Sequence, residues 1–461
     1  MEYLSSPYKR IYNAGFACYA LLAILAVIFY KERTIFTDTS FLLFQIVRTG
    51  SFVLDVTRLG AALTQVFPLL AVKASLSLNH VLLAYSLAFT IYYFACYVIC
   101  GLVLKRYDFA LLILLLNILF VTDTFYWIIS ELPQGIVLMI VCFAYMKSSH
   151  MIKPDTRAYV LLSLGIVSVA FFHPLVIFPF YYTLVFLLLR NETPPTRKAL
   201  YGAGILFLPV MAIKSYFLPL HDQQSIQEAG NLFKLFPHYL RLHSTKQFLH
   251  WSVTKYYWIP ITAAANIIVL TGLRQWWKLL LFLLSGIYIL LVNATYPSPD
   301  ITALYMENLY LPIAVFIGLP FVFDVLPVLQ KKKLAVPIVL VIIITGCIRI
   351  YNGRIPYVTQ LNWERKYLVA NGNRKLAVFD NCVPKDTLIM TWATPYEFWL
   401  LSTTEQHKTA SIIVIDNVKQ YDWAFGDKHS FIGAGQVFHY AELSPKYFLF
   451  TDSTTGYTLI K

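Results

Sequence analysis

Charged side chains are scarce in this sequence. Only 13% of its 461 residues are Asp, Glu, Lys or Arg, whereas soluble domains contain about 25%. Hydrophobic residues make up 58% of the chain. This composition excludes an ordinary soluble domain, and we interpret the chain as a protein that crosses a membrane several times.

Cysteine is also rare, with six residues in the whole chain. Five of them lie in apolar segments, where cysteine behaves as a small hydrophobic residue. Only Cys382 lies in a polar region, so a disulfide framework is excluded. No spacing of Cys and His matches a zinc site.

Basic residues exceed acidic ones and give a formal charge of +13. They cluster in short loops between apolar segments, which is the pattern of cytoplasmic loops in membrane proteins. No segment matches a nucleic-acid-binding module. We therefore attribute the excess of basic residues to membrane topology and expect no nucleic-acid partner.

Long apolar segments are abundant. A helix needs about 20 apolar residues to cross a bilayer, and fewer within a bundle. By this criterion we predict about eleven transmembrane helices. They lie near residues 11–30, 80–104, 109–122, 131–146, 158–172, 174–189, 199–218, 257–273, 278–293, 309–328 and 334–350. We expect the first to be a retained signal anchor, because no convincing small-residue cleavage site follows it.

The basic loops predict the orientation and the domain organisation. With Lys9 and Arg10 in the cytoplasm, every short basic loop falls on the same side, as the positive-inside rule requires. An odd number of helices then places the C-terminus outside. We predict a multi-pass protein of a bacterial cytoplasmic (inner) membrane, with a transmembrane domain at 1–350 and a periplasmic domain at 351–461.

The C-terminal region differs in character from the rest of the chain. Short β-rich runs occur at 387–390, 411–415 and 447–450, and turn residues separate them. Such runs predict a small extracytoplasmic α/β domain, and about 100 residues is a normal size for one.

Residues 36–68 lie between the first two predicted transmembrane helices and are not apolar enough to cross a bilayer. Their apolar residues recur at helical spacing between charged ones, which predicts two short amphipathic helices lying along a membrane surface. Asp38 precedes the first of these helices. An acid at the membrane–water boundary is a functional candidate, but Asp38 could also simply cap the helix.

Two more acids, Asp123 and Glu131, lie at outer ends of predicted transmembrane helices. Glu131 opens a helix, where the helix dipole favours a carboxylate. Alternatively, Asp38 and Glu131 could share one outer cavity and act as a base and as a metal or substrate ligand. His173, which precedes a proline between two helices, is either a structural residue or a phosphate-binding one.

Arg48 and Arg58 lie on the side where the positive-inside rule predicts few basic residues. An anionic ligand would explain them, because the forked guanidinium group suits phosphate. The long loop 219–256 mixes aromatic and basic residues. It is either an interfacial helix or a mobile lid over a site.

The order of these features resembles that of the GT-C glycosyltransferases, which include aminoarabinose transferases and protein O-mannosyltransferases. In that family the first outer loop contains in turn an Asp, an aromatic residue, a Gly, a basic residue and a Pro. The matching residues here are Asp38, Phe41, Gly50, Arg58 and Pro68. A family acid that opens the fourth helix is matched by Glu131. An Arg–Tyr pair before a Pro is matched by Tyr310 and Pro312 only, because the Arg is absent.

The resemblance implies an inverting transfer of a sugar from a polyprenyl-phosphate donor to a lipid, glycan or protein at the outer face of the membrane. Asp38 would be the general base, and Arg58 would stabilise the leaving phosphate. A divalent cation, Mg or Mn, could bind Asp38 and Glu131. The substrate-binding residues would be Glu131, Asp123, Arg58, Arg48, His173 and Tyr310.

Two other functions are compatible with the sequence. A transporter or flippase would be expected to show charges or broken helices at mid-membrane, together with a repeat. Here the polar residues collect at the outer ends of the helices, which favours an interfacial site. A non-catalytic GT-C-like assembly or binding protein would keep the fold without the chemistry, and the absent Arg before Tyr310 is compatible with that alternative.

Overall fold

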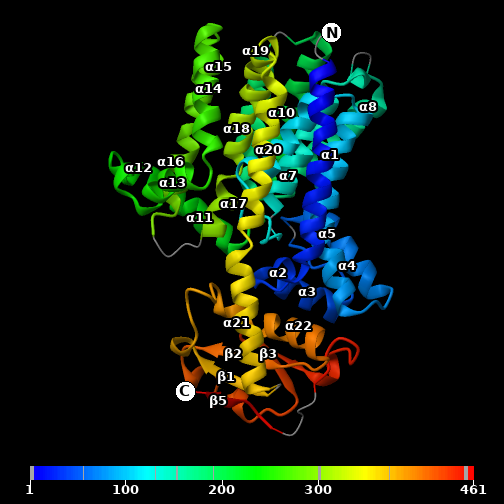
Figure 1. The fold of residues 1–461 in the computed structure, drawn as a ribbon, viewed down its shortest axis with the longest axis vertical. Helices are drawn as coiled ribbons and strands as arrows, with labels where there is room; N and C mark the ends of the chain where they lie inside the picture. The colour runs from blue at the N-terminus through cyan, green and yellow to red at the C-terminus, as the bar shows by residue number, and fades with distance from the viewer. Residues whose placement is uncertain are drawn as a thin grey trace.

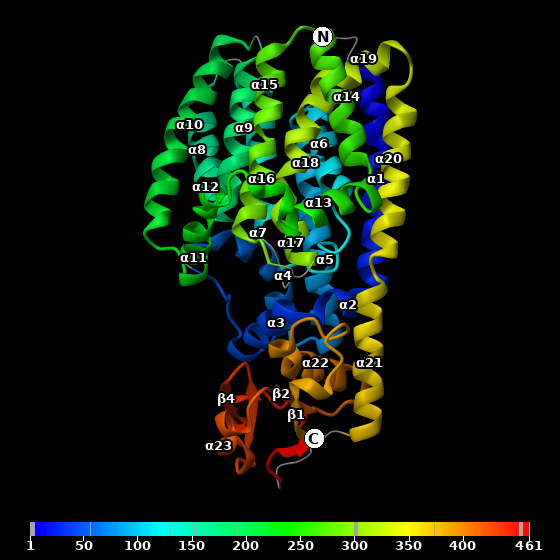
Figure 2. The ribbon, with the colours of Figure 1, turned by 90° about the vertical axis from the view of Figure 1, so that its left-hand side faces the viewer.

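The structure is a computed structural model with two parts, a helical bundle and a small α/β domain at one end of it (Figures 1 and 2). It describes residues 5–55, 57–129, 131–151, 154–190, 192–298, 303–372, 374–450 and 455–460. One long helix runs from the bundle into the α/β domain, so the two parts are joined directly.

Apolar helices form the bundle. They are α1 (Ser5–Ile28), α5 (Leu78–Val98), α6 (Tyr107–Leu119), α7 (Glu131–Met146), α8 (Thr156–Ala170), α9 (Ile177–Leu188), α10 (Pro194–Ser215), α14 (Trp258–Gly272), α15 (Trp276–Leu284), α16 (Gly286–Thr295), α17 (Ala303–Tyr310), α18 (Pro312–Pro320), α19 (Leu326–Lys331) and α20 (Ala335–Asn352). α6 lies at the centre, with 109–119 buried, and packs against α1, α5, α7, α18 and α20. Such a helix, apolar all round, is typical of a buried position.

Six helical segments of the described residues are long and apolar enough to cross a membrane. They are Tyr8–Ile28, Leu78–Val103, Pro194–Ser215, Trp276–Thr295, Ala303–Lys331 and Ala335–Asn371. A seventh is added if α14 and the preceding helix, which meet at 86°, form one broken span. The other predicted transmembrane segments are apolar helices of 13–16 residues. A helical membrane protein is therefore confirmed at this coarser level, while the count of eleven stays a prediction.

Short helices of the first loop lie between the bundle and the α/β domain (Figures 1 and 2). They are α2 (Tyr30–Thr34), α3 (Thr37–Thr49), η2 (Leu59–Ala61) and α4 (Ala62–Lys73). α3 ends at Thr49 and is followed by Gly50, whose φ of 61° is the left-handed conformation that terminates many helices. The two helices predicted in 36–68 are thus present as α3 and α4.

The C-terminal domain is built on a parallel sheet. Its strands are β1 (Lys375–Phe379), β2 (Ser411–Ile415) and β5 (Thr458–Ile460), in the order β2–β1–β5. β3 (Ser430–Gly433) and β4 (Gln436–His439) form an antiparallel hairpin, and α22 (Thr394–Gln406) packs against β2, β3 and α3. α20 continues through α21 (Ile355–Asn371) into this domain. The predicted boundary at residue 350 therefore falls within one long helix.

Of the three predicted β-rich runs, only 411–415 is a strand, β2. The runs 387–390 and 447–450 are turns and irregular segments, so those predictions were wrong. Their apolar residues Leu388, Tyr447 and Phe448 are buried without strand pairing. The Leu388 N–H donates to Pro384 O at 2.8 Å, which is a turn rather than a ladder. Hydrophobic side chains there indicate burial, which does not by itself require a strand.

Candidate functional site

Asp38 lies in the first turn of α3, where it is half-buried. The helix begins at Thr37 with Phe36 as its N-cap, and the side chain of Phe36 forms no capping hydrogen bond. Asp38 is therefore not the N-cap residue, but its carboxylate interacts with the backbone N–H of its own residue in the first turn of α3, so the capping interpretation stays a prediction beside the catalytic one.

The backbone before Asp38 is held by the C-terminal domain. Thr37 has a φ of 39°, a strained conformation for a β-branched residue. Its N–H donates to Oε1 of Glu397 at 2.6 Å, and Glu397 is fully buried in α22. Burial raises the pKa of Glu397 to about 7, and the Thr37 N–H partly opposes this rise. Glu397 therefore positions the first turn of α3, and Asp38 with it.

Arg58 joins three segments that are far apart in the sequence. Its Nη2 donates to Oδ1 and Oδ2 of Asp222 at 2.9 and 3.1 Å, and its Nη1 donates to Oε2 of Glu131 at 3.3 Å. Glu131 begins α7, and Asp222 lies in the first turn of α11 (Leu220–Ala229). The guanidinium is thus matched by two carboxylates. We call Asp38, Arg58, Glu131 and Asp222 the Arg58 cluster.

Asp38 is the member of this cluster without an ion pair to any described residue. Burial raises the pKa of Asp38, while the indole of Trp127 and the charge of Arg58 lower it in part. The Trp127 N–H lies near Asp38 without standard hydrogen-bond geometry and is itself buried. A half-buried carboxylate with a raised pKa beside a cation is a common feature of catalytic acids and bases.

His173 lies near the cluster but serves the backbone. Its Nδ1 accepts the N–H of Leu175 at 3.2 Å and so caps η5 (Pro174–Val176). Burial lowers the pKa of His173 well below its usual value, and Arg58 and Lys214 lower it further. A neutral imidazole is therefore expected near pH 7, which favours the structural interpretation over cationic phosphate binding.

Arg48 and Tyr310 contact other parts of the molecule. Arg48 donates to Oε1 of Gln45 at 2.8 and 3.1 Å and lies 5.2 Å from the ring centre of Phe438 in the C-terminal domain. Tyr310 is fully buried and donates its hydroxyl to Asn293. The structure does not bring either side chain into contact with the Arg58 cluster.

Asp123 belongs to a separate buried network. Lys255 donates to its Oδ2, and Glu307 accepts the N–H groups of Thr122 and Thr124 at 2.7 and 2.8 Å. Burial and Glu307 raise the pKa of Asp123 to about 6, against the lowering effect of Lys255. These contacts fasten the loop after α6 to α17 and to the bend before α14. Asp123 is therefore paired structurally, and within the described part of the chain it forms no hydrogen bond or ion pair with Asp38 or Arg58.

The predicted divalent cation finds no donor set in the described residues. No three His, Cys, Asp or Glu side chains of that part of the chain gather in a group that could hold a metal ion. Glu131, one of the two predicted ligands, is bonded to Arg58 instead.

Sequence reasoning missed two residues of the site. Asp222 is 164 residues from Arg58, and Glu397 is 360 residues from Thr37, so no local spacing connects them. The only signal for Asp222 was an acid at a helix start within the loop 219–256. No protein-family model, curated protein or solved structure matches the chain. The geometry of the Arg58 cluster is therefore the basis for a functional proposal.

Proposed function

We propose that the protein is a GT-C-type membrane glycosyltransferase that moves a sugar from a polyprenyl-phosphate donor to an acceptor hydroxyl at the outer face of a bacterial cytoplasmic membrane. The observation that carries the proposal is Asp38, a half-buried carboxylate with a raised pKa and no ion pair to a described residue, next to Arg58. The resemblance in residues 38–68 to the GT-C loop supports the same reaction.

Asp38 acts as the general base in this reaction. It takes the proton of the acceptor hydroxyl while the acceptor oxygen bonds to the anomeric carbon. The bond from that carbon to the phosphate oxygen breaks, and the lipid phosphate leaves with the electron pair. A raised pKa suits this role, because proton transfer is most efficient when the pKa of the base approaches the working pH. The Glu397–Thr37 hydrogen bond holds Asp38 in place for the attack.

Arg58 stabilises the leaving phosphate in this proposal. The ion pair between Arg58 and Asp222 must break before the phosphate can bind. Asp222 lies in loop 219–256, which continues through α12 (Asn231–Lys234), η6 (His238–Arg241) and α13 (His243–Thr254). Leu220, Phe233 and Leu240 in this loop have exposed fractions of 76%, 83% and 73%, which suits contact with a membrane surface. The loop is thus an interfacial segment latched onto Arg58 by Asp222, and it opens when a phosphate replaces that carboxylate.

The decisive experiment replaces Asp38 by Asn in membranes supplied with labelled polyprenyl-phosphate sugar. Asn keeps the size of the side chain but cannot take a proton, and a general base contributes about 10²–10⁴-fold to rate. We expect Asp38→Asn to fold, insert and lose transfer at least about a hundredfold. Asp55→Asn, an exposed change in the same loop, serves as the matched control and should stay active.

A non-catalytic binding protein is the second candidate, and one observation favours it. Arg58 is fully matched by Glu131 and Asp222, as expected of a cation that holds a fold together. Full activity of Asp38→Asn would overturn the enzymatic proposal. Binding of the lipid-linked sugar with no turnover in the unmodified protein would establish the binding role instead.

A further inference from the structure

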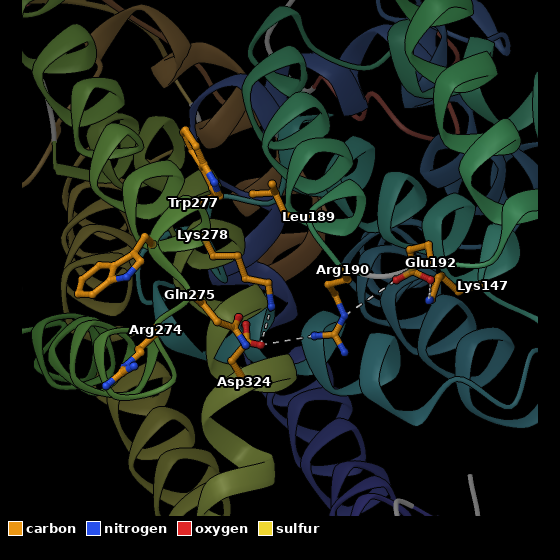
Figure 3. Close-up of a pocket in the computed structure, with 10 residues that line it drawn as sticks. Lys147, Leu189, Arg190, Glu192, Arg274, Gln275, Trp277, Lys278 and Asp324 are labelled. Carbon is orange, nitrogen blue, oxygen red and sulfur yellow. Dashed lines mark hydrogen bonds and ion pairs between the residues drawn. The ribbon is translucent and has the colours of Figure 1, made fainter.

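An open pocket of about 740 Å³ lies at the other end of the bundle, opposite the C-terminal domain. The segments that follow α7 and α9, the start of α15 and η7 (Phe321–Val325) form it (Figure 3). Neither the Arg58 cluster nor the proposed transfer reaction uses this pocket.

The pocket has more cationic than anionic groups. Lys147, Arg190, Arg274 and Lys278 are four cations, against the two carboxylates of Glu192 and Asp324, which leaves an excess of two positive charges. Figure 3 shows Arg190 between the two carboxylates. Its nitrogens lie 4.0 Å from Glu192 and 3.6 Å from Asp324, longer than the 2.7–2.9 Å typical of a charge-assisted hydrogen bond. Its Nη1 also donates to Phe323 O at 3.3 Å, and the other N–H groups of the guanidinium remain for an anion.

Arg274 and the start of α15 add to this capacity. Arg274 is exposed and makes no ion pair with the described residues. α15 begins at Trp276, and Trp276, Trp277 and Lys278 line the pocket. The first N–H groups of a helix have no partner within it and favour an anion. The start of α15, Arg190 and Arg274 thus all line the same pocket.

Two buried acceptors in the pocket have no hydrogen-bond partner among the described residues. They are Oε1 of Gln275 and Oδ2 of Asp324, and Asp324 is only 6% exposed. A buried acceptor is normally satisfied in a native structure, so a donor from outside the chain is expected there. A bare phosphate dianion supplies no such donor, whereas hydroxyl groups do.

We propose that this pocket binds a hydroxyl-bearing phosphate ester, the chemistry of a glycerol-type anionic phospholipid headgroup. The phosphate lies against Arg190, Arg274 and the start of α15, and the hydroxyl groups donate to Gln275 and Asp324. The lipid source is favoured by Trp276 and Trp277, which are 58% and 73% exposed at the mouth. Tryptophan is enriched at membrane–water interfaces, where headgroups lie.

The test titrates the purified full chain in detergent with dihexanoyl phosphatidylglycerol, dihexanoyl phosphatidylcholine and glycerol 3-phosphate, and follows Trp fluorescence and Tm. We expect phosphatidylglycerol to bind and raise Tm, with phosphatidylcholine at least about tenfold weaker, because it lacks both the net charge and the hydroxyls. Equal binding of glycerol 3-phosphate would support the pocket chemistry and assign a soluble ligand. Equal binding of phosphatidylcholine, or no binding of any probe, would overturn the proposal.

Variants link the binding to the pocket. Arg190→Gln and Arg274→Gln should each weaken phosphatidylglycerol binding by about tenfold, the effect of one charge-assisted contact. Arg274→Gln breaks no ion pair with a described residue, so it tests the pocket even if Arg190→Gln folds poorly. Arg197→Gln is the matched control, since Arg197 is an exposed residue of α10 that does not line the pocket. Unchanged binding in both pocket variants would overturn the proposal.

Discussion

The two ends of the bundle each place an arginine between two carboxylates, but with opposite consequences. Arg58 is bonded at 2.9–3.3 Å to Asp222 and Glu131, and the nearby group without an ion pair to a described residue is an acid, Asp38. Arg190 lies 3.6–4.0 Å from Asp324 and Glu192, each of which has its own lysine. The first arrangement leaves a carboxylate available for proton transfer, and the second leaves cations available for an anion.

Topology is the largest test of this comparison, because the expected result is all or none. If the end of the bundle that contains Arg190 is cytoplasmic, a reporter fused at the C-terminus should be active when it requires the periplasm. A reporter that requires the cytoplasm should be inactive there. The C-terminal domain and the Arg58 cluster lie at the same end of the bundle. The reverse reporter pattern would place Asp38 in the cytoplasm and contradict an outer-face transferase.

Replacing each arginine by Gln should lower the free energy of unfolding by different amounts at the two ends of the bundle. Arg58→Gln removes the partner of Glu131 and Asp222, and breaking a fully buried pair in this way lowers the free energy of unfolding by about 3–5 kcal/mol. We expect a smaller loss, about 2–3 kcal/mol, because Arg58 is 26% exposed. In Arg190→Gln, Glu192 keeps its ion pair with Lys147 and Asp324 keeps its ion pair with Lys278. We therefore expect the free energy of unfolding to fall by less than about 1 kcal/mol. Denaturant unfolding in detergent measures both. Equal losses would remove the distinction between a tightly bonded and a loosely held arginine.

Asp222→Asn should open the loop 219–256 without unfolding the bundle. Arg58 keeps Glu131, so we expect a loss of about 1 kcal/mol, equivalent to about a fivefold rise in opening. Limited digestion with trypsin measures this opening, because an open loop is cleaved faster after Lys234 and Arg241, which both lie in it. Asp422→Asn, an exposed change in the C-terminal domain, should leave the cleavage rate unchanged. A loop that is cleaved no faster in Asp222→Asn would not be latched by Asp222.

The remaining test is the pH dependence of the Glu397 contact. The pKa of Glu397 is raised from 4.5 to about 7 in the folded protein, so the folded state holds a proton that the unfolded state loses between these values. Its contribution to stability is full below about pH 4.5 and falls as pH rises to about 7. Glu397→Gln keeps an acceptor for the Thr37 N–H and removes this titration. We expect its Tm to exceed that of the unmodified chain by about 2–4 °C more at pH 8 than at pH 4.5. A difference independent of pH would show that Glu397 does not titrate in this window.

Local features of the sequence determined the helices, several boundaries and one strand. The predicted helix at 131–146 is α7 residue for residue, and 411–415 is β2. The length of an apolar run and the residue that opens or ends it are properties of neighbouring residues. The sequence therefore also located Asp38, Arg58 and Glu131 as charged residues at the ends of apolar segments.

Only the tertiary structure decided which of these charges meet. Asp222 and Glu397 join the site across 164 and 360 residues, and Asp123 is drawn into a different network by Lys255 and Glu307. An ion pair needs its atoms within about 4 Å, and that distance depends on how helices and domains pack. The residue types alone established that charges line both ends of the bundle, and packing established that one arginine is bonded to its two carboxylates at 2.9–3.3 Å while the other lies 3.6–4.0 Å from its own.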